Sequence, residues 1–376
     1  MRDDFLLMNP GPVPLPERVR EAMSETMVSH RSSDFEEVYT ECKELLEDVF
    51  QTDDDVLIFN SSGSGAMEAA IANTCGEDDV VVSLVNGKFG RRLRRIAERY
   101  AGEVRELDID WGESFDLDEV RELVDEDVDA VTMVHNETSS GVLNPAEEVG
   151  QISDGNDALF LMDGVTSIGG DDVPVDDWKV DVAIVGSQKC LGAPPGLSAV
   201  AISDDAKVEV DGEEAPFYFD IDKHLGKLPD DQTPFTSSVS LFRGLREALR
   251  IIDEEGMDER VERHRKLSRA VREAIRAWGV ELFADLREGS DYSNTVTGFV
   301  IPEETSDEEI RGTLSERGIS ISGGQAHLGG DIIRIATMAN CGEEEVLRVV
   351  GEIQDVLEDS DFQVDGDGVK AAEEVL

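Results

Sequence analysis

Over roughly its first two-thirds, the 376-residue chain alternates short apolar runs with stretches of helical periodicity. Apolar runs of five or six residues fit the strands of a buried sheet, and the segments between them place apolar residues on one helical face. This alternation is typical of a mostly parallel sheet covered by helices on both faces, an α/β fold. The expected strands are residues 55–60, 80–85, 130–134, 158–163, 182–186 and 198–203, and helices are expected at 91–100 and 117–124.

The last third of the chain predicts a smaller α+β companion. Helical patterns over 239–255 and 257–278 lead to a strand (295–301), a helix (307–317), a strand (332–336) and a helix (343–357). We therefore predict a large domain at 16–255 and a small domain formed by 1–15 with 256–376. The segment 1–15 is expected to pack near the functional site. The acidic, glycine-containing stretch 358–376 is expected to fray.

Charge narrows the possible partners. Asp and Glu number 85 against 34 Lys and Arg, a formal net charge of −51. Such a surface repels nucleic acid and anionic membranes, so neither is predicted as a partner. The hydrophobic fraction of 40% excludes a chain too polar to fold. Only nine basic residues are lysine, a composition like that of haloarchaeal proteins, which work in concentrated salt that screens repulsion between carboxylates. A mesophilic protein of unusual acidity is the alternative.

Four scattered cysteines show no metal-binding or disulfide spacing: Cys42, Cys75, Cys190 and Cys341. We therefore predict neither a metal site nor a disulfide framework. The first eight residues carry acids where a signal peptide needs cations, and no apolar run approaches 18 residues. A cytoplasmic location is the expectation.

A serine- and glycine-rich segment, Ser61-Ser-Gly-Ser-Gly-Ala-Met-Glu68, follows the first expected strand and opens a helix. Glycines let the backbone approach a ligand, and the free N–H groups of a helix start favour a phosphate. A plain turn with serine as the helix cap is an equally good interpretation.

Three charged residues lie at the end of an expected strand, just after one, or within one. Asp163 ends an apolar strand, and a capping or surface aspartate is its plain alternative. Lys189 follows another strand between glycine and proline turns, where a desolvated amine becomes a nucleophile rather than a solvated surface cation. Arg334 interrupts the apolar strand 332–336, where its planar fork suits a carboxylate, although a structural ion pair would also explain it. A lysine, an acid, a phosphate loop and a guanidinium are together the groups that bind pyridoxal phosphate and an amino acid.

The sequence resembles class V (fold type I) aminotransferases of the alanine–glyoxylate and serine–pyruvate group. The resemblance runs in order from about residue 8 to 357. Its segments are Asn9-Pro-Gly-Pro-Val, Val28-Ser-His-Arg-Ser, Ser62-Gly-Ser-Gly-Ala-Met-Glu-Ala-Ala, Gly87-Lys-Phe-Gly, His135-Asn-Glu-Thr-Ser-Ser-Gly, Asp163-Gly-Val-Thr-Ser-Ile-Gly-Gly, Gly186-Ser-Gln-Lys-Cys-Leu-Gly-Ala-Pro-Pro-Gly, Thr236-Ser-Ser-Val-Ser-Leu, Gly323-Gly and Ile333-Arg-Ile.

The resemblance implies a role for each matching residue. Lys189 would bond to the cofactor and later move the Cα proton, and Asp163 would pair with the pyridine nitrogen. The phosphate would be held by Ser64, Gly65, Ala66, Gln188 and, from the partner subunit of a homodimer, Thr236. The cofactor ring would lie on Phe89 with its 3′ oxygen near Thr138, while Arg334 and Gly11 would bind the substrate.

Some positions depart from the family. A partner-subunit tyrosine that contacts the phosphate in the animal enzymes corresponds to Thr233, which lacks the phenol, and Phe89 stands where they often have tryptophan. Cys190 is expected to be a packing residue. Cysteine desulfurases usually carry histidine where this chain has Gln188, and their catalytic-cysteine loop is not evident here.

The implied reaction is ping-pong transfer of the amino group of alanine or serine to glyoxylate or pyruvate. Donors with a second anionic group, such as aspartate, phosphoserine or aminoethylphosphonate, need a second cation. The candidates for it are His30, Arg31, Arg243 and His327, which sequence cannot place. A cysteine desulfurase-like lyase and a cofactor-free scaffold are the remaining alternatives.

Overall fold

The computed structural model describes residues 5–210, 215–287 and 289–376. Its centre is a seven-stranded sheet, in which four neighbouring pairs are parallel and β10 alone runs antiparallel to both of its neighbours. In spatial order the strands are β2 (Asp55–Phe59), β10 (Ser198–Ile202), β9 (Val182–Gly186), β8 (Leu159–Asp163), β5 (Ala130–Val134), β3 (Val80–Val85) and β4 (Glu103–Asp108). The predicted α/β class is therefore confirmed.

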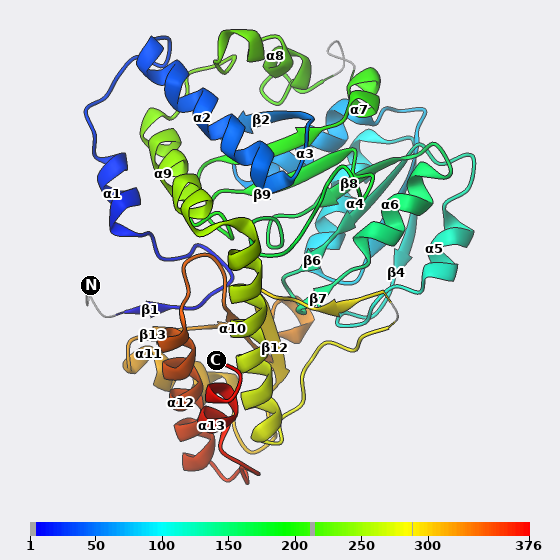
Figure 1. Cartoon of the computed structure of the whole chain (residues 1–376). Coiled ribbons are helices and arrows are strands. Elements are labelled where there is room, and N and C mark those ends of the chain that lie inside the picture. Colours follow the sequence, from blue (N-terminus) through cyan, green and yellow to red (C-terminus); the bar gives the residue numbers. More distant parts are fainter. Residues whose placement is uncertain (1–4, 211–214, 288) are drawn as a thin grey trace.

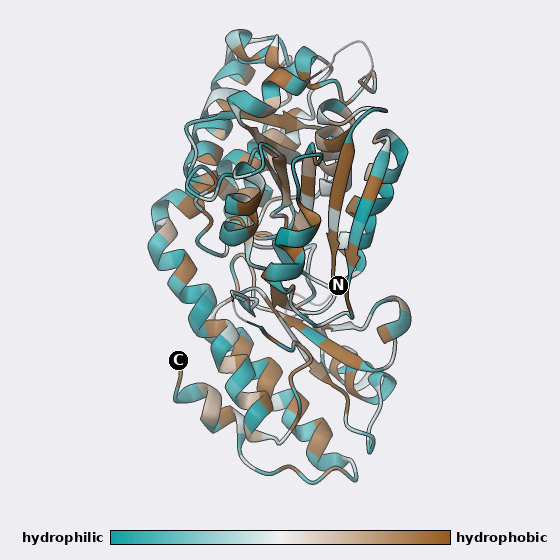
Figure 2. Cartoon of the chain, turned by 90° about the vertical axis from the view of Figure 1, so that its right-hand side faces the viewer, coloured by the Kyte–Doolittle hydropathy of each residue, from teal (hydrophilic) through white to brown (hydrophobic). Residues whose placement is uncertain are grey.

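Helices cover both faces of this sheet, because alternate residues of each strand point to opposite sides. Val82 and Met133 join one apolar cluster, whereas Val81 and Val134 join the other. The first face is covered by α2 (Ser33–Phe50), α5 (Leu117–Leu123), α6 (Ala146–Asp154) and α9 (Val239–Glu255). The second face is covered by α3 (Gly63–Thr74), α4 (Lys88–Tyr100) and α7 (Asp204–Glu209). Figure 2 shows the central strands as largely hydrophobic and the outer helices as mixed.

The remaining elements complete the chain. Near the large sheet lie α1 (Glu17–Met23), α8 (Ile221–Leu225) and the 3-10 turn η1 (Leu228–Asp230). A three-stranded antiparallel sheet has the order β12 (Val296–Val300), β15 (Ile332–Ala336) and β14 (Ser322–Gly323), and another has the order β11 (Asp291–Tyr292), β7 (Val142–Leu143) and β6 (Asn136–Glu137). The C-terminal helices are α10 (Met257–Ala277), α11 (Asp307–Glu316), α12 (Glu343–Asp359) and α13 (Gly368–Glu373), with the 3-10 turn η2 (Ala326–Leu328).

The C-terminal elements share an apolar cluster of their own. It includes Leu267 of α10, Ile333 of β15, Ile353 of α12 and Trp278. Figure 1 shows α10 running from the large sheet down to this layer of helices. The start of the chain joins the same layer, since β1 (Leu6–Leu7) pairs in parallel with β13 (Ile319–Ser320).

The stretch after residue 357, which the sequence predicted to fray, is instead packed. Helix α13 lies against α10 and α12, and its Ala372 is fully buried. Gln354 ties the segment down, because its Oε1 accepts hydrogen bonds from Gly368 N (2.8 Å) and Trp278 Nε1 (3.1 Å). The prediction was wrong because the many acids obscured the short apolar face of this helix.

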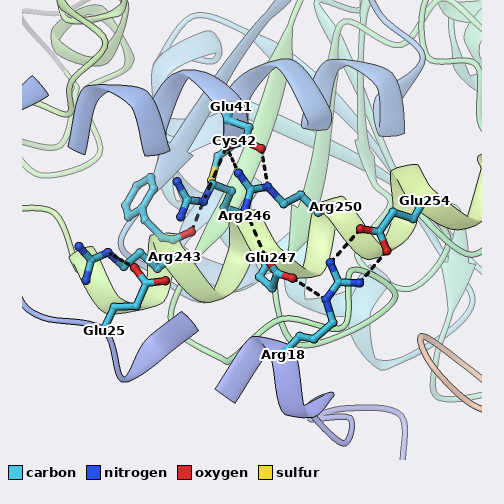
Figure 3. Close-up of polar contacts among 10 residues, drawn as sticks. Arg18, Glu25, Glu41, Cys42, Arg243, Arg246, Glu247, Arg250 and Glu254 are labelled. Atoms are coloured by element: carbon cyan, nitrogen blue, oxygen red, sulfur yellow. Dashed lines mark hydrogen bonds and ion pairs between the residues drawn. The ribbon is translucent and has the colours of Figure 1, made fainter. Parts of the chain in front are cut away.

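Ion pairs join α1, α2 and α9 at the surface (Figure 3). Arg250 donates twice to Glu41, at 2.5 and 2.8 Å, and Arg18 contacts Glu247 and Glu254 at 2.7 and 2.6 Å. We call these five side chains the helix network. No helix in the part of the chain that the structure describes is long and apolar enough to span a membrane.

Candidate active site

A cavity of about 140 Å³ opens where several parallel strands of the large sheet end. Strand–loop junctions at the carboxyl edge of such a sheet are the usual ligand site of this architecture. Segments following β2, β3, β5, β8 and β9 all reach this edge. The cavity is lined by Ser62, Gly63, Ser64, Met67, Phe89, Arg92, Thr138, Asp163, Val165, Thr166, Gln188 and Lys189.

Lys189 lies three residues beyond β9, with its side chain in the cavity wall. Burial lowers the pKa of its amine to about 8, because the charged form loses water. Its Nζ donates to the carbonyl oxygen of Pro10, which brings the start of the chain onto the lysine. Gly11 follows at φ +76°, and a Cβ there would lie 2.4 Å from Lys189 Cδ. A residue with a side chain at position 11 would therefore displace the lysine.

Asp163 is the last residue of β8 and is almost fully buried. Burial raises the pKa of its carboxyl to about 7. Its Oδ1 accepts one hydrogen bond, from Val165 N at 2.9 Å. No ion pair to Asp163 occurs among the described residues, so a cationic ligand in the cavity would find a carboxylate that gains from pairing.

The serine- and glycine-rich segment forms the first turn of α3. Ser64 lines the cavity, and its hydroxyl accepts a hydrogen bond from Arg92 Nη1 at 2.7 Å. Gly65 N and Ala66 N both donate to the carbonyl oxygen of Ser62, at 2.8 and 3.3 Å. Ser64 therefore faces the cavity directly, while Gly65 and Ala66 complete the turn behind it.

Three other predicted residues line the cavity. Thr138 Oγ1 lies 2.9 Å from Thr166 Oγ1, and Gln188 Oε1 is buried without a hydrogen-bond partner among the described residues. Phe89, in the first turn of α4, presents an aromatic ring to the same space. The positions of Ser64, Phe89, Thr138, Asp163, Gln188 and Lys189 thus bring six predicted residues together.

Arg334 is 3% exposed at the centre of β15 and lies beside the cavity lining rather than within it. Its Nε and Nη2 donate to Gly323 O at 3.0 and 2.9 Å, and its Nη1 donates to Thr138 O at 2.8 Å. Burial lowers the pKa of the guanidinium to about 10, yet no acid within the described residues pairs with it. Backbone carbonyls therefore hold the group in place while its charge stays available for an anion.

Thr236 does not line this cavity in its own chain. It is exposed on the turn after η1, which Arg31 holds through hydrogen bonds to the carbonyls of Thr233 (2.7 Å) and Pro234 (3.2 Å). The Thr233 hydroxyl is buried within its own subunit, bonded to Phe235 O and Ser237 Oγ.

The other candidate cations have different surroundings. Arg243 donates to Thr26 O at 2.7 Å and pairs with Glu25 at 3.2 Å, and Figure 3 shows it turned toward that acid. The ring of His327 packs 4.5 Å from that of Trp111. His30 is partly exposed.

Sequence reasoning missed Arg92 and Glu137. Arg92 lies three positions after Phe89 on α4, so helical spacing alone would have placed both on one face. Glu137 is fully buried and accepts hydrogen bonds from Phe89 N and Gly90 N at 3.0 and 3.1 Å. It thereby fixes the start of α4. Gly90 and Glu137 are 47 positions apart, so no local sequence pattern could have predicted this contact.

These groups fit pyridoxal phosphate. The cavity offers an amine, an acid without an ion-pair partner among the described residues, a hydroxyl, a side-chain amide whose N–H group can donate to an anion, and an aromatic ring, with a guanidinium beside it. Lys189 would hold the aldehyde carbon, Asp163 the pyridine nitrogen, and Ser64 with Gln188 the phosphate. The fold and these groups define a pyridoxal phosphate enzyme of fold type I.

Comparisons with known proteins support the assignment to the pyridoxal phosphate enzymes of fold type I. The family model described as aminotransferase class-V matches residues 5–349. An uncharacterized aminotransferase of Methanocaldococcus jannaschii is 41% identical, over 99% of the length of this chain and 97% of the length of the relative. The serine–glyoxylate aminotransferase of Arabidopsis thaliana is 34% identical over 98% and 94%. The crystal structure of ureidoglycine–glyoxylate aminotransferase from Bacillus subtilis superposes with a TM-score of 0.91 at 32% identity, covering 100% of this chain and 98% of that one. The chain belongs to the class V aminotransferase family, whose cofactor is pyridoxal phosphate.

Proposed function

We propose that this aminotransferase moves the amino group of a small amino acid, alanine or serine, to a 2-oxo acid such as glyoxylate or pyruvate. The observation that carries the proposal is the unpaired Arg334 guanidinium, held beside a cavity that contains Lys189 and Asp163. One such fork suits one α-carboxylate. Two similar proteins, the Arabidopsis and Bacillus enzymes, bear names that specify glyoxylate as a substrate, which supports this acceptor.

The residues would divide the work as follows. Bound pyridoxal phosphate supplies an electron sink for the electrons of the substrate Cα–H bond. Lys189 would hold the cofactor, and its amine, mostly neutral above about pH 8, would take and return the Cα proton. Asp163 would keep the pyridine nitrogen protonated, because a buried carboxylate stabilises an adjacent cation. Arg334 would orient the carboxylate of donor and acceptor in turn. Because the bound cofactor would keep the amino group between the two half-reactions, the kinetics would be ping-pong.

We also propose a homodimer in which Thr236 reaches the partner's phosphate site. Its exposure on a turn held by Arg31 supports this arrangement. The separate apolar clusters support the division into 16–255 and 1–15 with 256–376. If the dimer completes the site, dilution to monomers will release the cofactor, and gel filtration with absorbance detection would measure both events.

We further propose a cytoplasmic protein of haloarchaeal character, and the net charge of −51 supports its need for concentrated salt. Removing salt lengthens the Debye length from about 3 Å at 1 M to about 30 Å at 0.01 M, so carboxylates across the surface would repel one another. Circular dichroism during dialysis would follow the expected unfolding. A fold that persists at low salt would contradict this part of the proposal.

The test of function is the visible absorbance of the protein in concentrated salt with pyridoxal phosphate. Alanine, serine, aspartate, phosphoserine and cysteine would be added separately, each followed by glyoxylate. Bleaching by alanine or serine, reversed by glyoxylate, is the expected result. Bleaching by aspartate or phosphoserine alone would reassign the donor and require a second cation. Sulfur release from cysteine would instead indicate a lyase, and no band at all would reject the proposal.

A further inference from the structure

One cation in the cavity has no role so far. Arg92 extends from α4 into the lining, where its Nη1 donates to the Ser64 hydroxyl at 2.7 Å. Its guanidinium carbon lies 4.8 Å from the centre of the Phe89 ring. The side chain therefore sits between the ring-stacking residue and the phosphate loop that the family pattern implies.

The pairing of α4 makes this placement unusual. Arg91 pairs with Asp108, and Arg94 pairs with Glu98, Glu106 and Asp108. Arg92, Arg95 and Arg99 have no acid partner among the described residues, and Arg92 is the one of these three that lines the cavity. Among the described residues, its only hydrogen bond goes to a neutral hydroxyl, which leaves most donors of the guanidinium open to an anion.

The phosphate site also lacks a donor. The family pattern places a partner tyrosine at position 233. Here that position is Thr233, a residue that is only 1% exposed and whose hydroxyl is hydrogen-bonded within its own subunit. Without Arg92, the cavity lining would offer a phosphate only neutral donors and Lys189, whose amine is needed for the aldehyde. A phosphate monoester carries between one and two negative charges near pH 7 and binds guanidinium strongly.

We propose that Arg92 binds the phosphate of pyridoxal phosphate and supplies a charged donor at a site where the tyrosine contact is missing. The inference rests on the proposed function, because it takes the cavity as the cofactor site. The planar fork would contact phosphate oxygens while Ser64 holds one of its N–H groups in register. A purely structural role, in which Arg92 only fixes Phe89 and Ser64, is the competing explanation.

The test compares pyridoxal phosphate with pyridoxal, which has the same aldehyde and ring but no phosphate. Apoprotein of the wild type and of Arg92→Gln would be titrated with each compound in concentrated salt, following the visible band. Loss of a charge-assisted contact should weaken pyridoxal phosphate binding about 10- to 100-fold. Pyridoxal binding should stay within about twofold, because pyridoxal lacks the phosphate that the arginine would contact.

Two variants make the result decisive. Arg95→Gln removes an exposed arginine of the same helix that does not line the cavity, and it should change neither affinity. Arg92→Lys keeps the charge but loses the fork, so it should weaken pyridoxal phosphate by about tenfold or less. This variant answers the question if Arg92→Gln does not fold.

If Arg92→Gln weakens the binding of both compounds equally, the structural role is correct and the proposal is overturned. If the substitution weakens the binding of neither compound, the proposal is also overturned. If wild-type protein binds pyridoxal phosphate and bleaches with an amino acid, such a result rejects Arg92 alone. If wild-type protein binds no pyridoxal phosphate, both the proposed function and the assignment of Arg92 fail.

Discussion

The charged residues of the helix network and those around the cavity differ in whether they form ion pairs. The helix network pairs every member with an opposite charge across α1, α2 and α9. Around the cavity, Lys189, Asp163, Arg92 and Arg334 form no ion pair with one another or with any described residue. A chain with 85 acids offers partners almost everywhere. Exposed cations such as Arg95 and Arg99 also form no ion pair among the described residues, so it is a cation without an acid partner beside a cavity that indicates an anionic ligand.

Of the charged residues around the cavity, Lys189 should give the largest effect when it is replaced by alanine. We expect the visible band of bound pyridoxal phosphate to lose its lysine-dependent form and transamination to fall by about 10³-fold or more, since one group supplies both attachment and proton transfer. Absorbance and a coupled assay would measure the two effects. Lys266→Ala, which removes a surface pair with Glu343, is the matched control. Full activity in Lys189→Ala would place the chemistry elsewhere.

Arg334→Gln should have the next largest effect. Losing a charged fork costs about 1.5–3 kcal/mol per contact, so kcat/KM for the amino donor should fall about 10- to 150-fold. Steady-state kinetics would measure it, with Arg317→Gln, a surface arginine paired with Glu352, as the control. Arg334→Lys should lose less than Arg334→Gln. Unchanged kcat/KM in both variants would show that another group binds the carboxylate.

The lowered pKa of Lys189 should also be visible in the pH dependence of cofactor binding. Its pKa of about 8 lies below the ordinary 10.5, so the amine is protonated below pH 8 and neutral above it. The rate at which apoprotein captures pyridoxal phosphate should rise about tenfold per pH unit up to about pH 8 and then level off. Rapid-mixing absorbance would measure it, beside a free lysine derivative as reference. A capture rate that still climbs to pH 10 would contradict the burial of this amine.

The helix network should give the smallest effect. A double-mutant cycle with Glu41→Gln and Arg250→Gln should show a coupling below about 1 kcal/mol, because both side chains are partly exposed. Chemical denaturation in moderate and in concentrated salt would measure it, and the coupling should shrink as salt rises. Coupling as large as the effect of Arg334→Gln would remove the distinction between the two groups.

Much of the fold was accessible from the sequence. The strands at 80–85, 130–134 and 182–186 have the predicted bounds, because buried parallel strands are continuous apolar runs. Strand β4 was missed because it has the sequence Glu-Val-Arg-Glu-Leu-Asp, whose exposed edge position allows many charges. The antiparallel direction of β10 was also out of reach, since strand direction depends on contacts between segments far apart in the chain.

The candidate site was predictable to the extent that it follows strand ends. Asp163 ends β8 and Lys189 lies three residues after β9, so the parallel topology brings them together. Arg92 sits within a helix rich in arginine, where its spacing of three from Phe89 was the one sequence signal that separated it from Arg91 and Arg94. Whether Thr236 completes a neighbour's site depends on a second chain and stays a prediction.

The contact of the chain's early residues with Lys189 has a consequence for biosynthesis. Asn9 donates to Ser322 at 2.8 Å across a separation of 313 residues, and Met8 O accepts from Ala336 N. At roughly 5–20 residues per second, a ribosome needs about 15–60 s to make that interval. During this time the segment bearing Pro10 and Gly11 has no partner strand to hold it against the lysine. The nascent chain can therefore complete its large sheet well before the segment with Pro10 and Gly11 can be held against Lys189.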